Sequence, residues 1–340
     1  MSTLINAVFL FAFGLLHYQA NCQEMTILQS IAKLLSDRRS HSLWTPSIAY
    51  EEYPKNEYQQ RQFDKDQKYE TQVELILADL LVQLLGTAAA QELFKRASVY
   101  GLPSFDSLIF FDNYIISYDR RLKQPTWSME YYHGRQMVKY GRLFRPGHYY
   151  FPDLSVHRYF RSSDFDYENS NYFRGHFTAA FDVPTNLRIM QQSFLYSNVA
   201  PMRYNIYRVD SLWYRLETYC NFIARRSKHT YIVTGAVYLP ARSRMSYAII
   251  GKSRIAVPSH FYKVILHETK AGIVLMEVFL VPNGDGPDDQ SRLEQFRLNV
   301  AVDLPHLEKL TGLRFYDLLD RANMLKPTCF QHGYEDRLPK

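Results

Sequence analysis

The residues best suited to chemistry lie between Tyr172 and Glu217. His176 follows Gly175 where a strand is predicted to end, and its side chain can take a proton from water because an imidazole titrates near neutral pH. A second strand is predicted next, and the segment bearing Asn205 and Asp210 then enters a helix that carries a carboxylate. Because hard cations bind oxygen donors, this order of elements is one way to hold a general base beside a metal ion.

A histidine behind a glycine has two interpretations. Glycine permits a strained turn or a close approach of the backbone to a ligand, which suits a catalytic site. A histidine in such a place is, however, more often a structural residue whose ring nitrogens bond within the fold. The tripeptide Arg174–His176 is therefore weak evidence for catalysis by itself, and the surrounding segments must decide.

The composition sets broad limits on the kind of protein. Its 340 residues carry 40 Lys and Arg against 34 Asp and Glu, and this net charge of +6 mildly favours a polyanionic partner, although ordinary solubility explains it at least as well. The 27 tyrosines and 22 phenylalanines can form an aromatic core or base-stacking surfaces. The cysteines are too few for a disulfide framework or a zinc site, and leave open a single bridge between Cys220 and Cys329.

The chain begins with an apolar run of about ten residues, Ala7–Leu16, which is too short to span a bilayer comfortably and suits a signal peptide. Small residues allow cleavage between Ala20 and Gln23, but no Lys or Arg precedes the run. Because no acidic residue comes before Glu24, organelle targeting or retention of the run as a membrane anchor stays open beside secretion.

The elements that must position the candidate residues follow a helical N-terminal part. Helical spacing of apolar residues predicts helices over Met25–Leu35, Val73–Leu85 and Ala88–Ala97, with a polar linker over Tyr50–Tyr69. We therefore expect four parts: a signal or targeting segment (1–23), a helical extension with its linker (24–95), a main domain (96–325) and a C-terminal tail (326–340).

The main domain is rich in strand-like runs. A hairpin is predicted from Tyr114–Tyr118 and Trp127–Tyr132, and Leu304–Leu319 is predicted to be helical around Gly312. Further strands are predicted at Tyr231–Gly235, Ala236–Tyr238, Ser246–Gly251, Val257–Leu266 and Ile273–Leu280. Strands grouped together without regular β-α alternation predict an α+β fold, in which helices flank a central, largely antiparallel sheet.

Several separate motifs occur in one order between residues 96 and 325, and together they carry a resemblance. They are Tyr100–Pro103, Tyr118–Asp119, Trp127, Arg174–His176, Tyr196–Pro201, Trp213 with Leu216–Glu217, Thr234–Gly235, Leu239–Pro240, Ile250–Lys252 and Val257–Lys263. In this order they resemble the DNA/RNA non-specific endonucleases of the endonuclease G type.

The resemblance implies a ββα-metal nuclease fold for residues 96–325 and hydrolysis of phosphodiester bonds in DNA and RNA with little sequence preference. It implies that His176 is the general base that activates water, that Arg174 faces the phosphate and that Glu217 orients the water shell of one Mg²⁺, or Mn²⁺ in its place. Arg145 would correspond to an arginine that stabilises the transition state, with a solvated surface arginine as the alternative.

Two departures from the family pattern leave a second function open. Phe173 stands where the family motif has an aspartate, and Val209, which cannot bind a hard cation, stands where the metal-binding asparagine is expected. The nearest oxygen ligands are Asn205 and Asp210. The alternative to a metal-dependent endonuclease is therefore a degenerate member that binds nucleic acid or a partner without cleavage.

Other expectations rest on position or on analogy. Asn198 keeps its position in the family pattern, but in a Ser-Asn-Val-Ala-Pro turn we expect its amide to cap the backbone. Analogy suggests a homodimer. The resemblance favours a mitochondrial address and the apolar N-terminal run favours secretion, with no stable membrane span in the mature chain unless that run is retained as an anchor.

Overall fold

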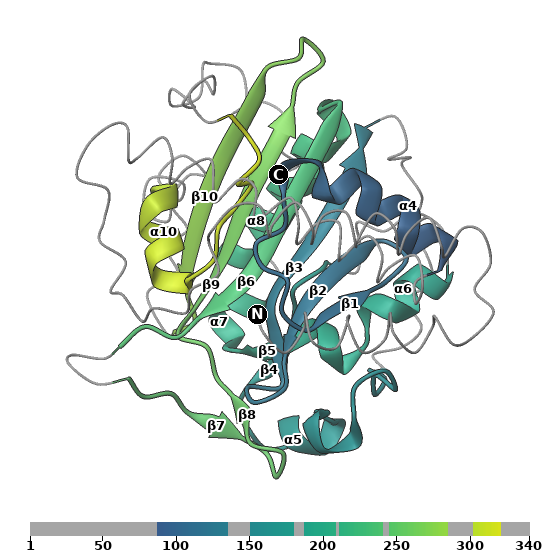
Figure 1. Ribbon diagram of the computed structural model, residues 1–340. Coiled ribbons are helices and arrows are strands. Elements are labelled where there is room, and N and C mark those ends of the chain that lie inside the picture. The colour runs from purple at the N-terminus through teal and green to yellow at the C-terminus, as the bar shows by residue number, and fades with distance from the viewer. Residues whose placement is uncertain are drawn as a thin grey trace, which may run out of the picture. The chain divides into compact units, whose positions relative to one another are not determined.

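The computed structural model describes residues 87–134, 150–179, 187–208, 211–240, 245–284 and 302–320 (Figure 1). All of them belong to the second of two compact units of the chain, Leu81–Lys340. The predicted helices Met25–Leu35 and Val73–Leu85, the apolar run Ala7–Leu16 and the C-terminal tail lie outside the described residues.

A six-stranded sheet organises the described part of the chain, in the order β1-β2-β3-β6-β9-β10, and every neighbouring pair in it is antiparallel. Helices cover the sheet, so the predicted α+β fold with a central antiparallel sheet is confirmed (Figure 1). The strands are β1 (Leu108–Phe110), β2 (Tyr114–Asp119), β3 (Gln124–His133), β6 (His229–Val237), β9 (His260–Glu268) and β10 (Val274–Pro282).

The β2–β3 hairpin agrees with the prediction, but the predicted break between Gly235 and Ala236 is wrong, because β6 is continuous through both residues. Gly235 lies opposite Tyr262 on β9, and a Cβ added to this glycine would lie 2.1 Å from the tyrosine side chain. The glycine is therefore a packing residue inside a strand and does not mark a turn.

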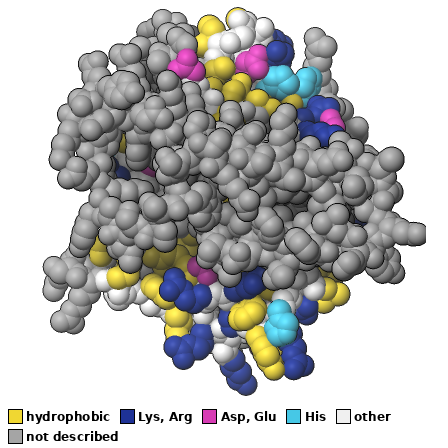
Figure 2. Space-filling model, in the orientation of Figure 1, with side chains coloured by type: hydrophobic (Ala, Val, Ile, Leu, Met, Phe, Trp, Pro, Cys, Tyr) yellow, Lys and Arg dark blue, Asp and Glu magenta, His cyan; other side chains and the backbone are white. Residues whose placement is uncertain are grey.

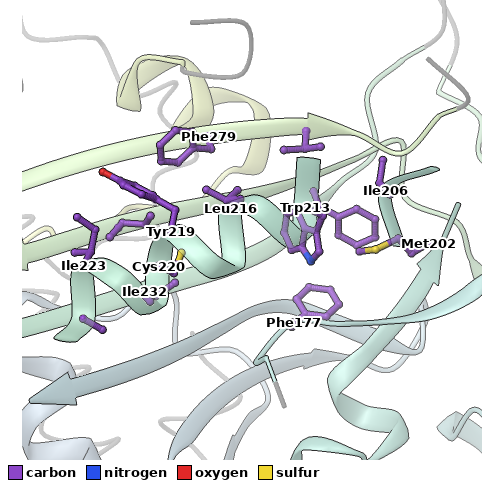
Figure 3. Close-up of a cluster of buried hydrophobic side chains, with 14 of the residues drawn as sticks. Phe177, Met202, Ile206, Trp213, Leu216, Tyr219, Cys220, Ile223, Ile232 and Phe279 are labelled. Atoms are coloured by element: carbon purple, nitrogen blue, oxygen red, sulfur yellow. The ribbon is translucent and has the colours of Figure 1, made fainter. Parts of the chain in front are cut away.

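Helix α8 (Leu212–Arg226) packs against one face of the sheet. Ser211 begins it by accepting a hydrogen bond from the backbone N–H of Tyr214 at 3.2 Å. Its buried side chains recur at helical spacing, as in Trp213, Leu216 and Cys220, and join aromatic and aliphatic residues of the sheet in one hydrophobic cluster (Figure 3). Cys220 is thus a core residue, and Cys329, with which the sequence left a bridge open, lies outside the described residues.

The opposite face of the sheet is covered by α4 (Ala88–Ala97), the 3₁₀ turn η1 (Ser98–Tyr100), α10 (Leu304–Thr311) and the segment after α10. Helix α4 has the bounds predicted for it. Helix α10 is shorter than predicted because Gly312 adopts a left-handed conformation (φ 69°) and ends it. The buried Tyr316 then donates a hydrogen bond to the carbonyl of Tyr231 at 3.1 Å and fixes this segment on the sheet.

Shorter elements complete the unit on the α8 side and at its edge. They are η3 (Arg158–Phe160), α5 (Asp164–Tyr167), β4 (Phe173–His176), α6 (Leu187–Ser193), η4 (Tyr196–Asn198), β5 (Val199–Met202), α7 (Tyr204–Tyr207), β7 (Ile249–Ile250) and β8 (Ile255–Ala256). Lys and Arg side chains gather beside hydrophobic ones along the lower edge of the face in Figure 2, where Figure 1 places β7, β8 and α5. Within the described ranges, no helix has the length and apolar character needed to cross a membrane.

Candidate active site

Strands β4 and β5 form an antiparallel pair that places the histidine motif. His176 pairs with Val199, and Gly175 pairs with Ala200. A Cβ added to Gly175 would lie 2.6 Å from the side chain of Met202 on β5, so the glycine allows the two strands to pack closely. Gly175 has no left-handed backbone. Of the two uses expected for this glycine, the strained turn is wrong; the close approach observed here is to β5, and an approach to a ligand stays a prediction.

Two aromatic rings enclose His176. Tyr150 stacks on the imidazole, with ring centroids 5.4 Å apart and an interplanar angle of 30°, and Phe194 meets it edge-on at 5.2 Å. The residue is half-buried, and the Nε2 atom of its ring is buried. The next residue, Phe177, is buried in the α8 cluster, and its backbone N–H donates to the carbonyl of Asn198 at 2.9 Å. The imidazole is therefore fixed between packed rings at the border of the core.

Asn198 is completely buried and bonds to the backbone through both ends of its amide. Its Oδ1 accepts from the N–H of Thr178 at 3.0 Å, and its Nδ2 donates to the carbonyls of Thr178 and Ser193 at 3.0 and 2.8 Å. This confirms the expectation that Asn198 caps the backbone. Its function is to fasten the segment after His176 to the end of α6.

Arg174 is held by a carboxylate from another part of the chain. Its Nη2 lies 2.6 Å from Oδ1 of Asp164 at the start of α5, and its Nε donates to the Tyr196 hydroxyl at 3.1 Å. The same Asp164 oxygen also accepts a short hydrogen bond from Tyr196. The guanidinium lies 5.4 Å from the ring centroid of Tyr150 and 5.0 Å from that of Tyr167. Phe173 stands directly before Arg174, where the resemblance leads us to expect an aspartate. The carboxylate beside Arg174 comes from Asp164 instead.

Phe173 belongs to an aromatic cluster at the surface. Its ring stacks on Tyr207 of α7 at 4.9 Å with an interplanar angle of 17°, and contacts Tyr204 at 5.4 Å. The pKa of the Tyr150 hydroxyl is raised well above its ordinary value, first by burial and then by the neighbouring Tyr207. Tyr150 in turn stacks on His176. Tyr207 therefore lies between the surface cluster and the residues that surround the histidine.

The side expected to hold a metal is only partly described. Asn205 is half-buried on α7, which adjoins both β4 and α8, and Glu217 is largely buried on α8 with 9% of its surface exposed. Asp210 and Arg145 lie outside the described residues. Among the residues that are described, no group of three or more His, Cys, Asp or Glu side chains is arranged to hold a metal ion. A site with one protein oxygen and several waters does not need such a group.

Two buried ionisable side chains, Lys263 and Glu130, lie in the sheet that α8 covers. Lys263 on β9 is 1% exposed, donates to the Thr234 hydroxyl at 2.7 Å, and places its ammonium 4.9 Å from the centroid of the Trp213 ring. Glu130 on β3 accepts from the Tyr132 hydroxyl at 2.7 Å. Burial raises the pKa of Glu130 to about 7, while the charge of Lys263 and the Tyr132 hydrogen bond oppose that rise. Trp213 is a core residue, as predicted, and its ring contacts the ammonium group of the buried Lys263.

Sequence patterns did not indicate that Tyr150, Asp164 and Phe194 are neighbours of the histidine motif. The pattern Ser163 followed by Asp166 could have predicted α5, because it forms a capping box in which Asp166 accepts from the Ser163 backbone at 2.9 Å. No local pattern indicates that α5 brings a carboxylate to Arg174. These contacts join residues far apart in the chain, so only the tertiary arrangement reveals them.

Comparison with known proteins agrees with this geometry. The sequence model of a family described as DNA/RNA non-specific endonuclease matches residues 96–322, which is about two thirds of the chain. The chain belongs to this family. Mitochondrial endonuclease G of Homo sapiens is 32% identical over 237 residues, covering 67% of this chain and 75% of the relative. Mitochondrial nuclease EXOG of Xenopus laevis is 33% identical over 225 residues, covering 64% of this chain and 60% of the relative.

Two further family comparisons extend this result. Mitochondrial endonuclease G of Caenorhabditis elegans is 28% identical over 261 residues, covering 75% of this chain and 82% of the relative. A crystal structure of an EndoG/EndoGI complex, which concerns the mechanism of EndoG inhibition, has a chain with a TM-score of 0.63 and 29% identity. The match covers 70% of this chain and 95% of that one. The ββα-metal nuclease fold that the resemblance implied is thereby confirmed.

Proposed function

We propose that this protein is a metal-dependent endonuclease that hydrolyses phosphodiester bonds of DNA and RNA with little sequence preference. The observation that carries the proposal is the enclosure of His176 between Tyr150 and Phe194, on the β4–β5 pair of a domain that belongs to a nuclease family. A half-buried imidazole fixed in this way suits proton transfer from a water molecule.

In this proposal His176 takes a proton from the water that attacks phosphorus. The rings of Tyr150 and Phe194 fix the imidazole plane, so little reorientation is required when the proton moves. The strand pair with β5 fixes the backbone of the same residue. His176 would then be the general base, in the position where the family places it.

Arg174 is proposed to face the phosphate while it stays anchored to Asp164. A guanidinium has five N–H donors, and the hydrogen bonds to Tyr196 and to Asp164 engage only its Nε and Nη2 groups. The anchor limits the movement of the side chain, and donors on Nη1 are left for a phosphate oxygen. Arg145, which lies outside the described residues, is proposed as a second arginine that stabilises the transition state.

The donors near the site fit Mg²⁺, or Mn²⁺, better than a softer metal. Asn205 offers an amide oxygen and Glu217 a carboxylate, and the amide of Asn198 is already bound to the backbone. A metal there would supply charge stabilisation at the phosphoryl oxygens. Asn205 or Asp210 would hold it, and Glu217 would orient its water molecules.

A plasmid-nicking assay tests the proposal. Purified full-length protein with Mg²⁺ or Mn²⁺ should nick supercoiled DNA and degrade RNA, and a chelator should stop both reactions. The His176→Ala variant should lose the activity while circular dichroism shows that it is still folded. If the wild-type protein shows no more cleavage than this variant in either metal, the proposal is wrong.

A second candidate is a member that binds nucleic acid or a partner without cleavage. The observation in its favour is that Phe173 replaces the motif aspartate and packs into an aromatic cluster. Salt-sensitive binding of DNA together with no cleavage in the nicking assay would support this candidate. Robust turnover would remove it.

We also propose a mitochondrial location and a homodimer. The location rests on the names of the relatives, which are mitochondrial endonuclease G and mitochondrial EXOG, and secretion is the alternative. Imaging of a C-terminal fusion with a mitochondrial marker tests the location. Light scattering of the purified protein tests the dimer, and a monomer mass would contradict it.

A further inference from the structure

We propose that adjoining turns at one end of the sheet form a docking surface for membranes that contain anionic lipids. The surface consists of residues 119–123, 154–168 and 245–254, and we call it the basic edge. It includes the turn before β3, helix α5 and the turn between β7 and β8, along the lower side of the molecule in Figure 1. Its proposed role does not depend on the nuclease activity.

Hydrogen bonds hold the segments of the basic edge together. The Asp166 carboxylate on α5 accepts from the backbone N–H of Ser253 at 2.8 Å, and the Lys123 ammonium donates to the Ser253 carbonyl. The Tyr118 hydroxyl, at the end of β2, donates to the carbonyl of Phe160 at 2.8 Å. Residues far apart in the sequence therefore form one continuous surface.

Large apolar side chains project from the basic edge. Leu154 and Phe165 each have 77% of their surface exposed, although leucine and phenylalanine are usually buried. Tyr159 is 66% exposed, and Ile249 on β7 is 48% exposed. Apolar side chains gathered in this way mark an interaction surface, whereas scattered single ones do not.

Exposed cations lie among these apolar side chains, and Figure 2 shows both kinds along the lower edge. The cations are Arg120, Arg121, Arg158, Lys252 and Arg254. Within the described ranges, none of these five side chains forms an ion pair with a carboxylate. Their charge is therefore directed to solvent, where an anionic partner can meet it.

Most carboxylates of the basic edge are bonded within the fold. Asp119 accepts two backbone N–H groups of its own turn, at 2.7 and 2.9 Å. Asp166 accepts two backbone N–H groups, at 2.9 and 2.8 Å, and Asp164 is paired with Arg174. Glu168 is exposed at the end of α5. The surface thus keeps an excess of positive charge.

The combination of aliphatic and basic side chains selects a lipid surface as the occupant. Cations attract any polyanion, but Leu154 and Ile249 cannot stack on a base as an aromatic ring can, whereas both leave water when they enter the acyl boundary of a bilayer. A second copy bound through a two-fold axis would bring the same cations together, and their repulsion opposes it. Anionic headgroups attract the cations while the apolar side chains enter the membrane.

Vesicle sedimentation tests the inference with full-length protein in a chelating buffer, so that no cleavage is required. Binding is measured to phosphatidylcholine vesicles and to vesicles in which roughly a third of the lipid is phosphatidylserine. We expect the wild type to bind the anionic vesicles at least about tenfold more tightly. The apolar run Ala7–Leu16 is present in every variant, so binding to neutral vesicles measures its contribution.

Two double variants separate the charged and the apolar contributions. Arg121→Glu combined with Lys252→Glu should weaken binding to the anionic vesicles by roughly ten- to a hundredfold, because each change replaces attraction by repulsion. Leu154→Ser combined with Phe165→Ser should weaken it by roughly five- to fiftyfold, because the contacts with the acyl boundary are lost. Circular dichroism checks that both variants are folded.

Lys95→Glu combined with Lys270→Glu is the matched control for charge reversal. Both lysines are exposed at the opposite end of the sheet, since Lys270 follows β9 and the turn after α4 contacts Tyr231 near the start of β6. This variant has the same net charge as the first double variant. It should bind the anionic vesicles within about threefold of the wild type, because its changes lie away from the membrane.

The inference is wrong if the wild type binds both kinds of vesicle equally, if either double variant of the basic edge binds like the wild type, or if the control loses as much affinity. If charge reversal leaves vesicle binding unchanged and weakens binding of a DNA oligonucleotide, the surface binds nucleic acid instead. If the Ser variants bind vesicles normally but convert a dimer to a monomer, the surface joins two copies instead. Nuclease activity in a plasmid assay is a separate result, since vesicle binding is measured without metal.

Discussion

His176 lies on a strand that is paired along its length with β5, and its ring is enclosed by Tyr150 and Phe194. Asn205, by contrast, lies on a helix of four residues whose tyrosines are exposed and which is flanked by Arg203 and Arg208. The proposed base and the proposed metal donor thus lie on neighbouring elements, β4 and α7, which differ in how many contacts hold them in place.

The difference indicates which half of the site has room to change. Backbone pairing, two ring contacts and the buried Asn198 amide all fix the histidine side, so a substitution there disturbs several contacts at once. A single helical turn at the surface can exchange one donor for another with little effect on the fold. In the sequence Arg174–His176 is intact, and Val209, which lies outside the described residues, stands where the resemblance leads us to expect asparagine.

The largest expected effect is on the histidine side. His176→Ala should lower the rate of DNA cleavage by roughly two to four orders of magnitude, the usual contribution of a general base. The readout is the initial rate of plasmid nicking at saturating Mg²⁺, with circular dichroism as the control for folding. A loss smaller than tenfold would show that the enclosed histidine is not the base.

The next effect concerns the sheet beneath α8. The pKa of Glu130 is raised from 4.5 to about 7 in the folded protein, so the unfolded chain releases this proton first as the pH increases. The contribution of Glu130 to stability is therefore present below pH 4.5 and is lost between pH 4.5 and about 7, by about 3 kcal/mol.

Glu130→Gln keeps a hydrogen-bond acceptor for Tyr132 and removes the titration. The difference between the unfolding free energies of the variant and the wild type should grow in favour of the variant as the pH rises from 5 to 8. Urea unfolding at several pH values measures this. A difference that stays constant with pH would mean that Glu130 is ionised throughout.

Substitutions at the proposed metal site should have a smaller effect, and they should either raise or lower the Mg²⁺ concentration that cleavage requires. Asn205→Ala should raise the Mg²⁺ concentration needed for half-maximal cleavage by about ten- to a hundredfold, a typical result of disturbing a metal site. Val209→Asn, which restores the family pattern, should lower that concentration. If neither variant changes the Mg²⁺ dependence, Asp210 becomes the preferred ligand, and Asp210→Asn is the matching test.

The smallest effect is expected at the anchor of Arg174. Asp164→Asn removes an ion pair in which the two side chains are 26% and 54% exposed, and solvent screening limits the loss of stability to below about 1 kcal/mol. Thermal melting measures it. A larger loss would mean that the Asp164, Tyr196 and Arg174 network acts as a unit and holds β4 more firmly than the single ion pair indicates.

The sequence predicted the elements with strong periodicity and the family, because both depend on local patterns. Helix α4, the β2–β3 hairpin and the core position of Trp213 follow from spacing alone. One strand boundary was predicted wrongly, because a glycine can either end a strand or make room for a large side chain inside one. A strand was predicted to end at Gly235, but in the sheet this glycine lies inside β6 and gives room to Tyr262.

The sequence by itself identified His176 as a candidate base. It also showed that the expected metal-binding asparagine is replaced, because both conclusions depend only on which residues stand in the motifs. Only the tertiary structure decided that Asp164 accompanies Arg174, that Tyr150 and Phe194 enclose the imidazole and that Phe173 joins α7 in an exposed aromatic cluster. The physical reason is that these contacts join segments brought together by burial of the shared core, which no local sequence pattern records.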